Sequence, residues 1–134
     1  MKSHRRFSAK QKPKSSAVQE KITVVAKVER LSHDGRGISR YQGKTLFISG
    51  ALPGEEVEAE IFQRKSKFAE ARCLKVISPS PDRAEPQCPH YAQCGGCELQ
   101  HLDSKAQINI KQEQALNQLQ RIGNIDPEQI MPAL

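Results

Sequence analysis

Three of the four cysteines of this 134-residue chain, Cys88, Cys94 and Cys97, lie in one short segment. Gly95 and Gly96 separate the last two, and glycine lets a backbone fold tightly enough for one loop to present all three sulfur atoms to one centre. No hydrophobic segment of a signal peptide follows the first methionine, so we expect a cytoplasmic protein. Because disulfides are rare in the cytoplasm, cysteines clustered in this way indicate metal or redox chemistry.

Two kinds of metal centre suit this cysteine segment. A zinc ion takes four tetrahedral ligands, here the three thiolates and the imidazole of His90 or His101. An iron–sulfur cluster takes four thiolates, and the segment offers three. The spacing favours zinc but matches neither kind of site closely, so it leaves the metal open. The fourth cysteine, Cys73, lies among alanines in a strand pattern and is predicted to be a buried thiol of the core.

The formal net charge of +6 comes from the beginning of the chain. Residues 1–16 contain no acidic residue, and beyond them basic and acidic residues are equally numerous. The segment has no hydrophobic pattern with which to offset the entropy lost on ordering it. We therefore predict that residues 1–19 form a disordered basic arm that contacts polyanions, rather than an organelle presequence. Its basic residues are Lys2, Arg5, Arg6, Lys10, Lys12 and Lys14.

Residues 20–79 have the pattern of a small β domain. Apolar and polar residues alternate over residues 21–29 and 56–61, which is typical of half-buried strands. Further strand-like segments follow turn residues at 38–41, 45–48 and 68–77. The fold class predicted is therefore mainly β, with a five-stranded OB-like barrel that ends at the prolines of residues 78–81. In the fifth strand a bulge would shift the inward phase from Ala69, Ala71 and Cys73 to Leu74 and Val76.

A helix is predicted after a cysteine-rich loop at residues 80–102. Asp103 or Ser104 can cap its start, and Gly123 can stop it after about Ile122, within a segment (103–134) that we interpret as the start of a larger domain. Ile110 projects nearly opposite to the other apolar residues, and a helix with two apolar sides needs two neighbours, of which the barrel is one. The other apolar residues are Ile108, Ala115, Leu116, Leu119 and Ile122.

Four segments of the chain resemble the N-terminal part of bacterial 23S ribosomal RNA (uracil-5-)-methyltransferases, in register over residues 20–125. The last segment is the most specific, because it combines Cys-Gly-Gly-Cys with a trailing Leu-Gln-His. The segments are His33-Asp34-Gly35-Arg36-Gly37-Ile38, Ser49-Gly50-Ala51-Leu52-Pro53-Gly54-Glu55, Ser80-Pro81-Asp82-Arg83, and residues 88–101.

This resemblance implies a fold, two cofactors and an activity. Residues 20–79 would be a TRAM domain, an RNA-binding barrel, and Cys88, Cys94 and Cys97 would ligate a 4Fe–4S cluster whose fourth cysteine lies outside this chain. The S-adenosylmethionine domain and the catalytic residues of the family also lie outside it, so we expect this RNA-binding part of a 5-methyluridine-forming enzyme to be inactive alone. The alternative is a freestanding RNA-binding module with a structural zinc site of three cysteines and one histidine.

An enzyme that methylates a base carbon must draw the base out of its stack, which requires a firm grip on the flanking RNA. Basic side chains on barrel turns are suited to hold phosphates, although such charges can also be merely solvated. No apolar run approaches the ~20 residues of a membrane span. We therefore expect ribosomal RNA as the partner of a monomer, without a membrane. The candidate RNA-binding residues are Arg36, Arg40, Lys44, Arg64, Lys65 and Lys67.

Overall fold

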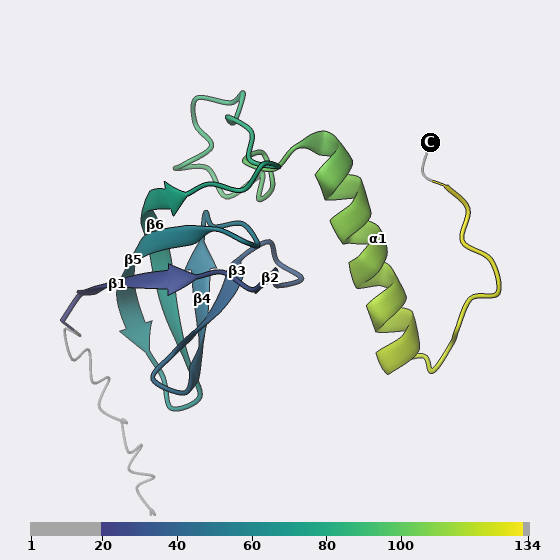
Figure 1. Ribbon diagram of the computed structural model, residues 1–134, viewed down its shortest axis with the longest axis horizontal. Helices are drawn as coiled ribbons and strands as arrows, with labels where there is room; N and C mark the ends of the chain where they lie inside the picture. The colour runs from purple at the N-terminus through teal and green to yellow at the C-terminus, as the bar shows by residue number, and fades with distance from the viewer. Residues whose placement is uncertain (1–19, 133–134) are drawn as a thin grey trace, which may run out of the picture.

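The computed structural model describes residues 20–132, so the predicted arm at residues 1–19 lies outside the described part. A β domain is followed by an irregular segment and then by a helix that stands beside the barrel (Figure 1). The elements are β1 (Ile22–Lys27), β2 (Arg30–Leu31), β3 (Gly37–Tyr41), β4 (Lys44–Ser49), β5 (Glu56–Arg64), β6 (Phe68–Ser78) and α1 (Ser104–Arg121).

The strands form one six-stranded sheet in the order β1-β5-β6-β4-β3-β2. Neighbouring strands are antiparallel except β4 and β6, which are parallel. The ends of this order approach each other: Ser39 Oγ donates to Lys27 O at 2.6 Å, and Glu29 N donates to Ile38 O at 2.8 Å. The sheet is curled like an OB barrel, but its strand ladder is not closed. The mainly β fold is confirmed, with six strands in place of five.

The additional strand, β2, arises where the alternating segment of residues 21–29 bends. Val28 still pairs on the β5 side, because its N–H donates to Glu55 O at 2.9 Å and its carbonyl accepts from Gly54 N at 2.9 Å. From Glu29 onward the chain pairs with β3 instead. One continuous segment therefore supplies β1 and β2, the two strands at opposite ends of the sheet order. The local pattern cannot reveal this bend, because Val28 bonds to Gly54 and Glu55, which are distant from it in sequence.

The core is aliphatic and lies between the inner faces of the strands. Val57, Ala59 and Ile61 point inward from β5 and are at most 1% exposed, as the alternation predicts. Full burial of a valine or isoleucine contributes roughly 1.5–3 kcal/mol, so this inner face holds the barrel together. The other buried members of the core are Ala26, Val28, Leu46, Ile48, Ala51, Ala69 and Ala71.

The strand β6 contains the predicted change of phase. Its register against β5 shifts between Glu58 and Ala59, which leaves Leu74 as an extra residue. Cys73 and Val76 pack against the core, whereas Leu74 is 47% exposed. The prediction that Leu74 points inward is therefore wrong, because the bulge turns the extra residue outward. Cys73 is half-buried, and burial raises the pKa of its thiol.

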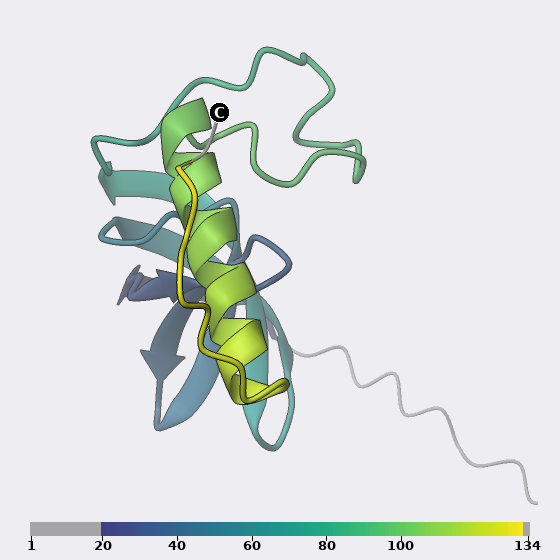
Figure 2. The same ribbon diagram turned by 90° about the vertical axis from the view of Figure 1, so that its right-hand side faces the viewer.

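The helix α1 begins and ends where the sequence predicts. Asp103 caps it by accepting a hydrogen bond from Lys105 N at 3.1 Å, and Ile122 closes its last turn. α1 lies against one side of the barrel, and the segment after it runs back along the helix on the side away from the barrel (Figure 2). Gln114 Nε2 donates to Ser32 O at 2.9 Å across the boundary with the barrel. Within residues 20–132, no helix is both long and apolar enough to cross a membrane.

Candidate nucleic-acid interface and cysteine loop

Two hairpin turns lie side by side at one end of the barrel. β3 and β4 are joined by Gln42 and Gly43, whose positive φ angles of 49° and 76° suit a two-residue hairpin turn. Residues 65–67 join β5 to β6. Because β4 and β6 run parallel, both turns occur at the same end, and Lys44 Nζ donates to Lys65 O at 3.2 Å.

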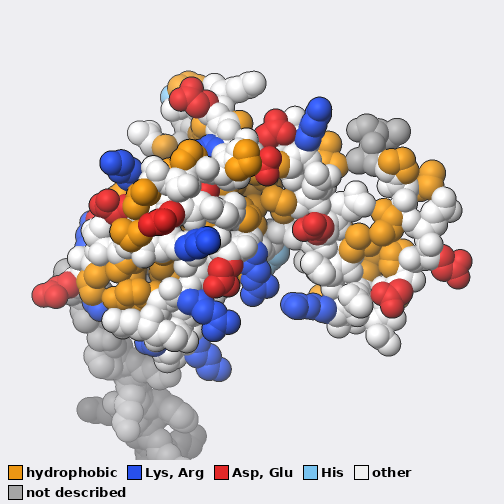
Figure 3. Space-filling model, viewed as in Figure 1, with side chains coloured by type: hydrophobic (Ala, Val, Ile, Leu, Met, Phe, Trp, Pro, Cys, Tyr) orange, Lys and Arg blue, Asp and Glu red, His pale blue; other side chains and the backbone are white. Residues whose placement is uncertain are grey.

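Four exposed basic residues on these strand ends and turns form what we call the basic turn: Lys44, Arg64, Lys65 and Lys67. Residues 63–68 themselves contain no acidic residue. Lys65 Nζ lies 4.8 Å from the centre of the Phe68 ring, which adds an aromatic surface to the charge. Figure 3 shows Lys and Arg side chains gathered over the lower part of the barrel. A surface of this kind is suited to contact phosphates.

The structure brings four of the six candidate RNA-binding residues together in the basic turn. Arg40 is exposed on β3 and pairs in register with Thr45, close to the same end of the barrel. Arg64 Nη2 donates to Glu20 O at 3.3 Å. Arg36 is not part of this group, because it precedes β3 and lies at the other end of that strand.

Arg36 is held on several sides. Its guanidinium makes ion pairs with Asp34 at 2.8 Å and with Glu70 at 3.1 Å. The carbon of the guanidinium lies 4.6 Å from the centre of the Phe47 ring. The charge of Arg36 is therefore balanced by two carboxylates, while its plane is fixed over an aromatic ring.

The carboxyl of Asp34 is expected to titrate with a pKa of about 2 instead of 3.8. Desolvation raises this pKa, but hydrogen bonds from Arg36 and Ser32 and the charge of Arg36 outweigh it and lower the value. Replacing Arg36 by leucine should return the pKa toward 3.8, measured by NMR titration of the Asp34 carboxyl carbon. An unchanged low pKa in that variant would show that Arg36 does not hold the carboxylate.

The three clustered cysteines lie on an irregular loop above the barrel. All are free thiols; Cys88 is half-buried, and Cys94 and Cys97 are exposed. Tight turns shape the loop, since Cys94 N donates to His90 O at 2.7 Å. Thiolates are fitting ligands for zinc or an iron–sulfur cluster. Among residues 20–132, however, no three His, Cys, Asp or Glu side chains gather to hold a metal ion, so the donor chemistry fits while the loop does not assemble a site.

His101 ends the cysteine loop and is buried, with 2% of its surface exposed. Its Nδ1 shares a hydrogen bond with the hydroxyl of Tyr91, which also donates to Glu98 O at 2.9 Å. Burial and then the charge of Arg83 lower the pKa of His101, so its ring is neutral at pH 7. The hydrogen bond between Tyr91 and His101 therefore joins the middle of the cysteine loop to its end.

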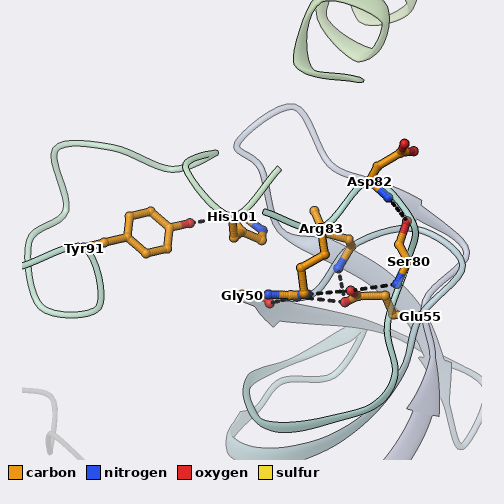
Figure 4. Close-up of polar contacts among 8 residues, drawn as sticks. Gly50, Glu55, Ser80, Asp82, Arg83, Tyr91 and His101 are labelled. Atoms are coloured by element: carbon orange, nitrogen blue, oxygen red, sulfur yellow. Dashed lines mark hydrogen bonds and ion pairs between the residues drawn. The ribbon is translucent and has the colours of Figure 1, made fainter. Parts of the chain in front are cut away.

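Glu55 and Arg83 form an ion pair where the loop leaves the barrel (Figure 4). Glu55 is fully buried, and it accepts from Arg83 Nε at 2.6 Å and from Arg83 Nη2 at 2.8 Å. Leu52 N and Ser80 N donate to the same carboxylate at 2.9 and 3.2 Å. Arg83 also donates to Gly50 O at 2.8 Å. The carboxylate thus has four donors, as a buried charge requires.

The ion pair joins the barrel to both ends of the cysteine loop. Arg83 forms an isolated antiparallel bridge with Leu102, and Ala84 N donates to His101 O at 2.9 Å. Sequence reasoning gave Glu55 and Arg83 no role, although both lie in the segments that carry the family resemblance. A single acid and a single base that are far apart in the chain produce no periodic signal, and only those segments could have pointed to them.

Comparison with known proteins agrees with this geometry. Residues 18–74 match the model of the TRAM domain family. A protein of Nitrosococcus oceani named 23S rRNA (uracil(1939)-C(5))-methyltransferase RlmD is 46% identical over 125 residues, which cover 93% of this chain and 27% of that protein. The proteins of the same name from Dechloromonas aromatica and Xanthomonas oryzae pv. oryzae are 48% and 50% identical, over 82% and 78% of this chain and 26% and 24% of their own lengths.

The chain therefore spans about a quarter of the length of these curated relatives. The TRAM match covers β1 to β5 and most of β6, which are the strands that present the basic turn. The similarity to the relative from Nitrosococcus oceani is broader, since it covers 93% of the chain. The resemblance seen in the sequence is thereby confirmed: residues 18–74 match the TRAM domain family, and the chain is similar to part of proteins named 23S rRNA (uracil(1939)-C(5))-methyltransferase.

Proposed function

We propose that this chain grips ribosomal RNA through the basic turn, as part of an S-adenosylmethionine-dependent 23S rRNA uracil-C5 methyltransferase. The observation that carries the proposal is the grouping of Lys44, Lys65 and Lys67 at one end of a TRAM barrel, without a neighbouring carboxylate in residues 63–68. The names of the relatives supply the substrate class, 23S rRNA.

The basic turn suits the physical need of base methylation. A uracil inside a folded RNA is stacked, and exposing it costs a few kcal/mol, so the enzyme must hold the flanking backbone while the base leaves its stack. The turns belong to a sheet with an aliphatic core, so the backbone positions that carry the positive charges keep fixed separations. A rigid pattern of charge recognises the shape of a folded RNA better than a flexible segment does. S-adenosylmethionine would supply the methyl group in the complete enzyme.

We further propose that Cys88, Cys94 and Cys97 are ligands of an iron–sulfur cluster. All three are free thiols on one loop, and Cys94 and Cys97 are exposed. The buried pairs Glu55–Arg83 and Tyr91–His101 tie this loop to the barrel without using a cysteine. The three thiols are therefore left available for a metal centre. The alternative is a zinc ion bound by the same cysteines, and metal analysis separates the two.

RNA binding is tested by replacing Lys44, Lys65 and Lys67 together with alanine. The slope of log Kd against log salt concentration should flatten by roughly 2, because each lost phosphate contact on a single strand removes about 0.7. Binding to a folded rRNA fragment should weaken more than binding to an unstructured homopolymer. Fluorescence anisotropy titrations at several salt concentrations measure both quantities.

The matched control removes the same charge from exposed positions outside the basic turn, Lys27, Lys75 and Lys105. It should leave the preference for the folded RNA unchanged. If the basic-turn variant binds both RNAs as tightly as the unmodified chain does, the turn is merely solvated and its role in RNA binding is wrong.

A further inference from the structure

A groove of about 460 Å³ separates the C-terminal half of α1 from the outer face of β2, β3 and β4. Its size falls within the roughly 300–1,000 Å³ of typical ligand sites. Figure 3 shows the corresponding hollow between the barrel and the lower half of the helix, with Lys and Arg side chains on both sides of it. The residues of the groove used below are Arg30, Arg36, Phe47, Asn117, Gln118 and Arg121.

The groove has a flat surface already in place. The guanidinium of Arg36 lies over the Phe47 ring at 4.6 Å and is held at its edges by Asp34 and Glu70. The Arg36 side chain still keeps 30% of its surface exposed. A planar group fixed in this way stacks on another planar group without losing further side-chain entropy. Nucleobases of unpaired RNA stack on arginine planes in this manner.

The charges of the groove favour an anion. Among the described residues that line it, Asp34 is the only acidic one, and Arg36 already pairs with it. Arg30 and Arg121 stand exposed on the barrel side and on the helix side, and neither has an ion pair within the described part of the chain. Two unneutralised guanidinium groups on opposite walls are suited to phosphate oxygens.

Amide side chains complete the lining. Asn117 and Gln118 lie on the helix wall, and no hydrogen bond of their side chains occurs within residues 20–132. An amide presents a donor and an acceptor together, which is the pattern that reads the edge of a base. A duplex hides these base edges in its grooves, whereas an unpaired nucleotide can place one base in a site of this size.

We propose that this groove binds one unpaired nucleotide of RNA. The base stacks on Arg36, the amides of Asn117 and Gln118 contact its edge, and Arg30 and Arg121 hold the phosphates. The inference rests on the proposed RNA-binding function and deepens it: the basic turn grips the backbone at one end of β3, while the groove binds single-stranded RNA at the other end of that strand. α1 thereby becomes part of the RNA-binding surface.

Two variants test the groove in the complete 134-residue chain. Replacing Arg36 by lysine keeps the charge but removes the plane, and should weaken binding to an unstructured oligonucleotide at least about fivefold, since stacking on one base is worth 1–3 kcal/mol. Replacing Arg30 and Arg121 together with alanine should flatten the salt slope for the same oligonucleotide by about 1.4. Anisotropy with this oligonucleotide and with a blunt RNA duplex gives both results.

Binding to the duplex should change less than twofold in both variants. The control replaces Lys75 and Lys105 with alanine, which removes equal charge outside the groove. An unchanged affinity for the oligonucleotide, or an equal loss for oligonucleotide and duplex, overturns the groove proposal. Neither result bears on the basic turn, which is tested by the separate alanine variant of Lys44, Lys65 and Lys67. A failure of the groove proposal can therefore be distinguished from a failure of the proposed function. If the Arg36→Lys chain folds poorly, the variant with alanine at Arg30 and Arg121 still decides the test. Both of these residues are exposed, so their replacement should not disturb the fold.

Discussion

Replacing Arg83 by methionine is expected to lower the free energy of unfolding by about 3–5 kcal/mol, because it leaves a buried carboxylate without its counter-charge. Glu55 is 0% exposed, and only the N–H groups of Leu52 and Ser80 would still donate to it. Urea denaturation followed by far-UV circular dichroism measures the loss. Arg40→Met is the matched control: Arg40 is exposed and has no ion pair in the described part of the chain, so the change should stay within about 0.5 kcal/mol.

A double variant distinguishes the charge from the packing. Glu55→Leu combined with Arg83→Met removes both charges, and should cost less than Arg83→Met alone, because no unpaired ion remains. A loss below 1 kcal/mol in the single Arg83 variant would contradict this account, since it would mean that the carboxylate needs no cation.

The ion pair between Glu55 and Arg83 also makes the stability of the fold depend on pH. Burial raises the pKa of Glu55, but the bonds from Arg83 and the backbone outweigh it, so the folded pKa lies below 4.5. The pair therefore stabilises the fold fully above about pH 4.5, and this contribution is lost as the pH falls through the lowered folded pKa. Without Arg83, burial should raise the folded pKa of Glu55 above its unfolded value, so this variant should lose stability as the pH rises and recover part of it when the carboxyl is protonated at low pH. Urea midpoints between pH 3 and pH 7 compare the two chains.

Metal binding is expected to disappear when Cys97 is replaced by serine. The unmodified chain, reconstituted anaerobically, should take up iron and sulfide and then lose them on desalting, because three thiolates leave one iron of a four-iron cluster without a protein ligand. Serine at Cys97 leaves two thiolates, which should abolish even transient uptake. Iron and sulfide analysis with visible absorbance, before and after desalting, provides the measurement.

Cys73→Ala serves as the control for this experiment. Cys73 packs against the barrel core, so its loss should leave iron uptake unchanged. One equivalent of zinc with no iron and no visible absorbance would overturn the cluster and favour the zinc site. Dependence of iron uptake on Cys73 would instead show that the four cysteines of the chain act together.

Much of the barrel is predictable because its signals are local. The inward faces of Val57 and Ile61 follow from a period of two, and the start of α1 follows from the capping ability of Asp103. The bend at Val28 and the outward position of Leu74 are different. The bend depends on the bonds of Val28 to Gly54 and Glu55, and the position of Leu74 depends on the exact register of β6 against β5, and neither is contained in the alternation of the segment itself.

In the candidate sites too, features within one segment are predictable, whereas contacts between separate elements are not. Lys65 and Lys67 stand out in the sequence because they share one turn, whereas their proximity to Lys44 depends on the pairing of β4 with β6. The position of the Arg36 guanidinium over the Phe47 ring likewise depends on a contact between separate elements. The groove was not predictable, because the sequence predicts that the helix neighbours the barrel but not which faces meet or that a hollow remains between them.

The parallel pairing of β4 with β6 also couples RNA binding to folding. The hairpins β3–β4 and β5–β6 are local and can form early, but their turns meet only when the non-local parallel pair forms. The unfolded chain therefore carries the basic residues of the basic turn but does not hold them close together. A ligand that prefers the arranged state stabilises it by mass action. Under the proposed function, RNA bound to the basic turn would therefore oppose the opening of this strand pair and stabilise the barrel.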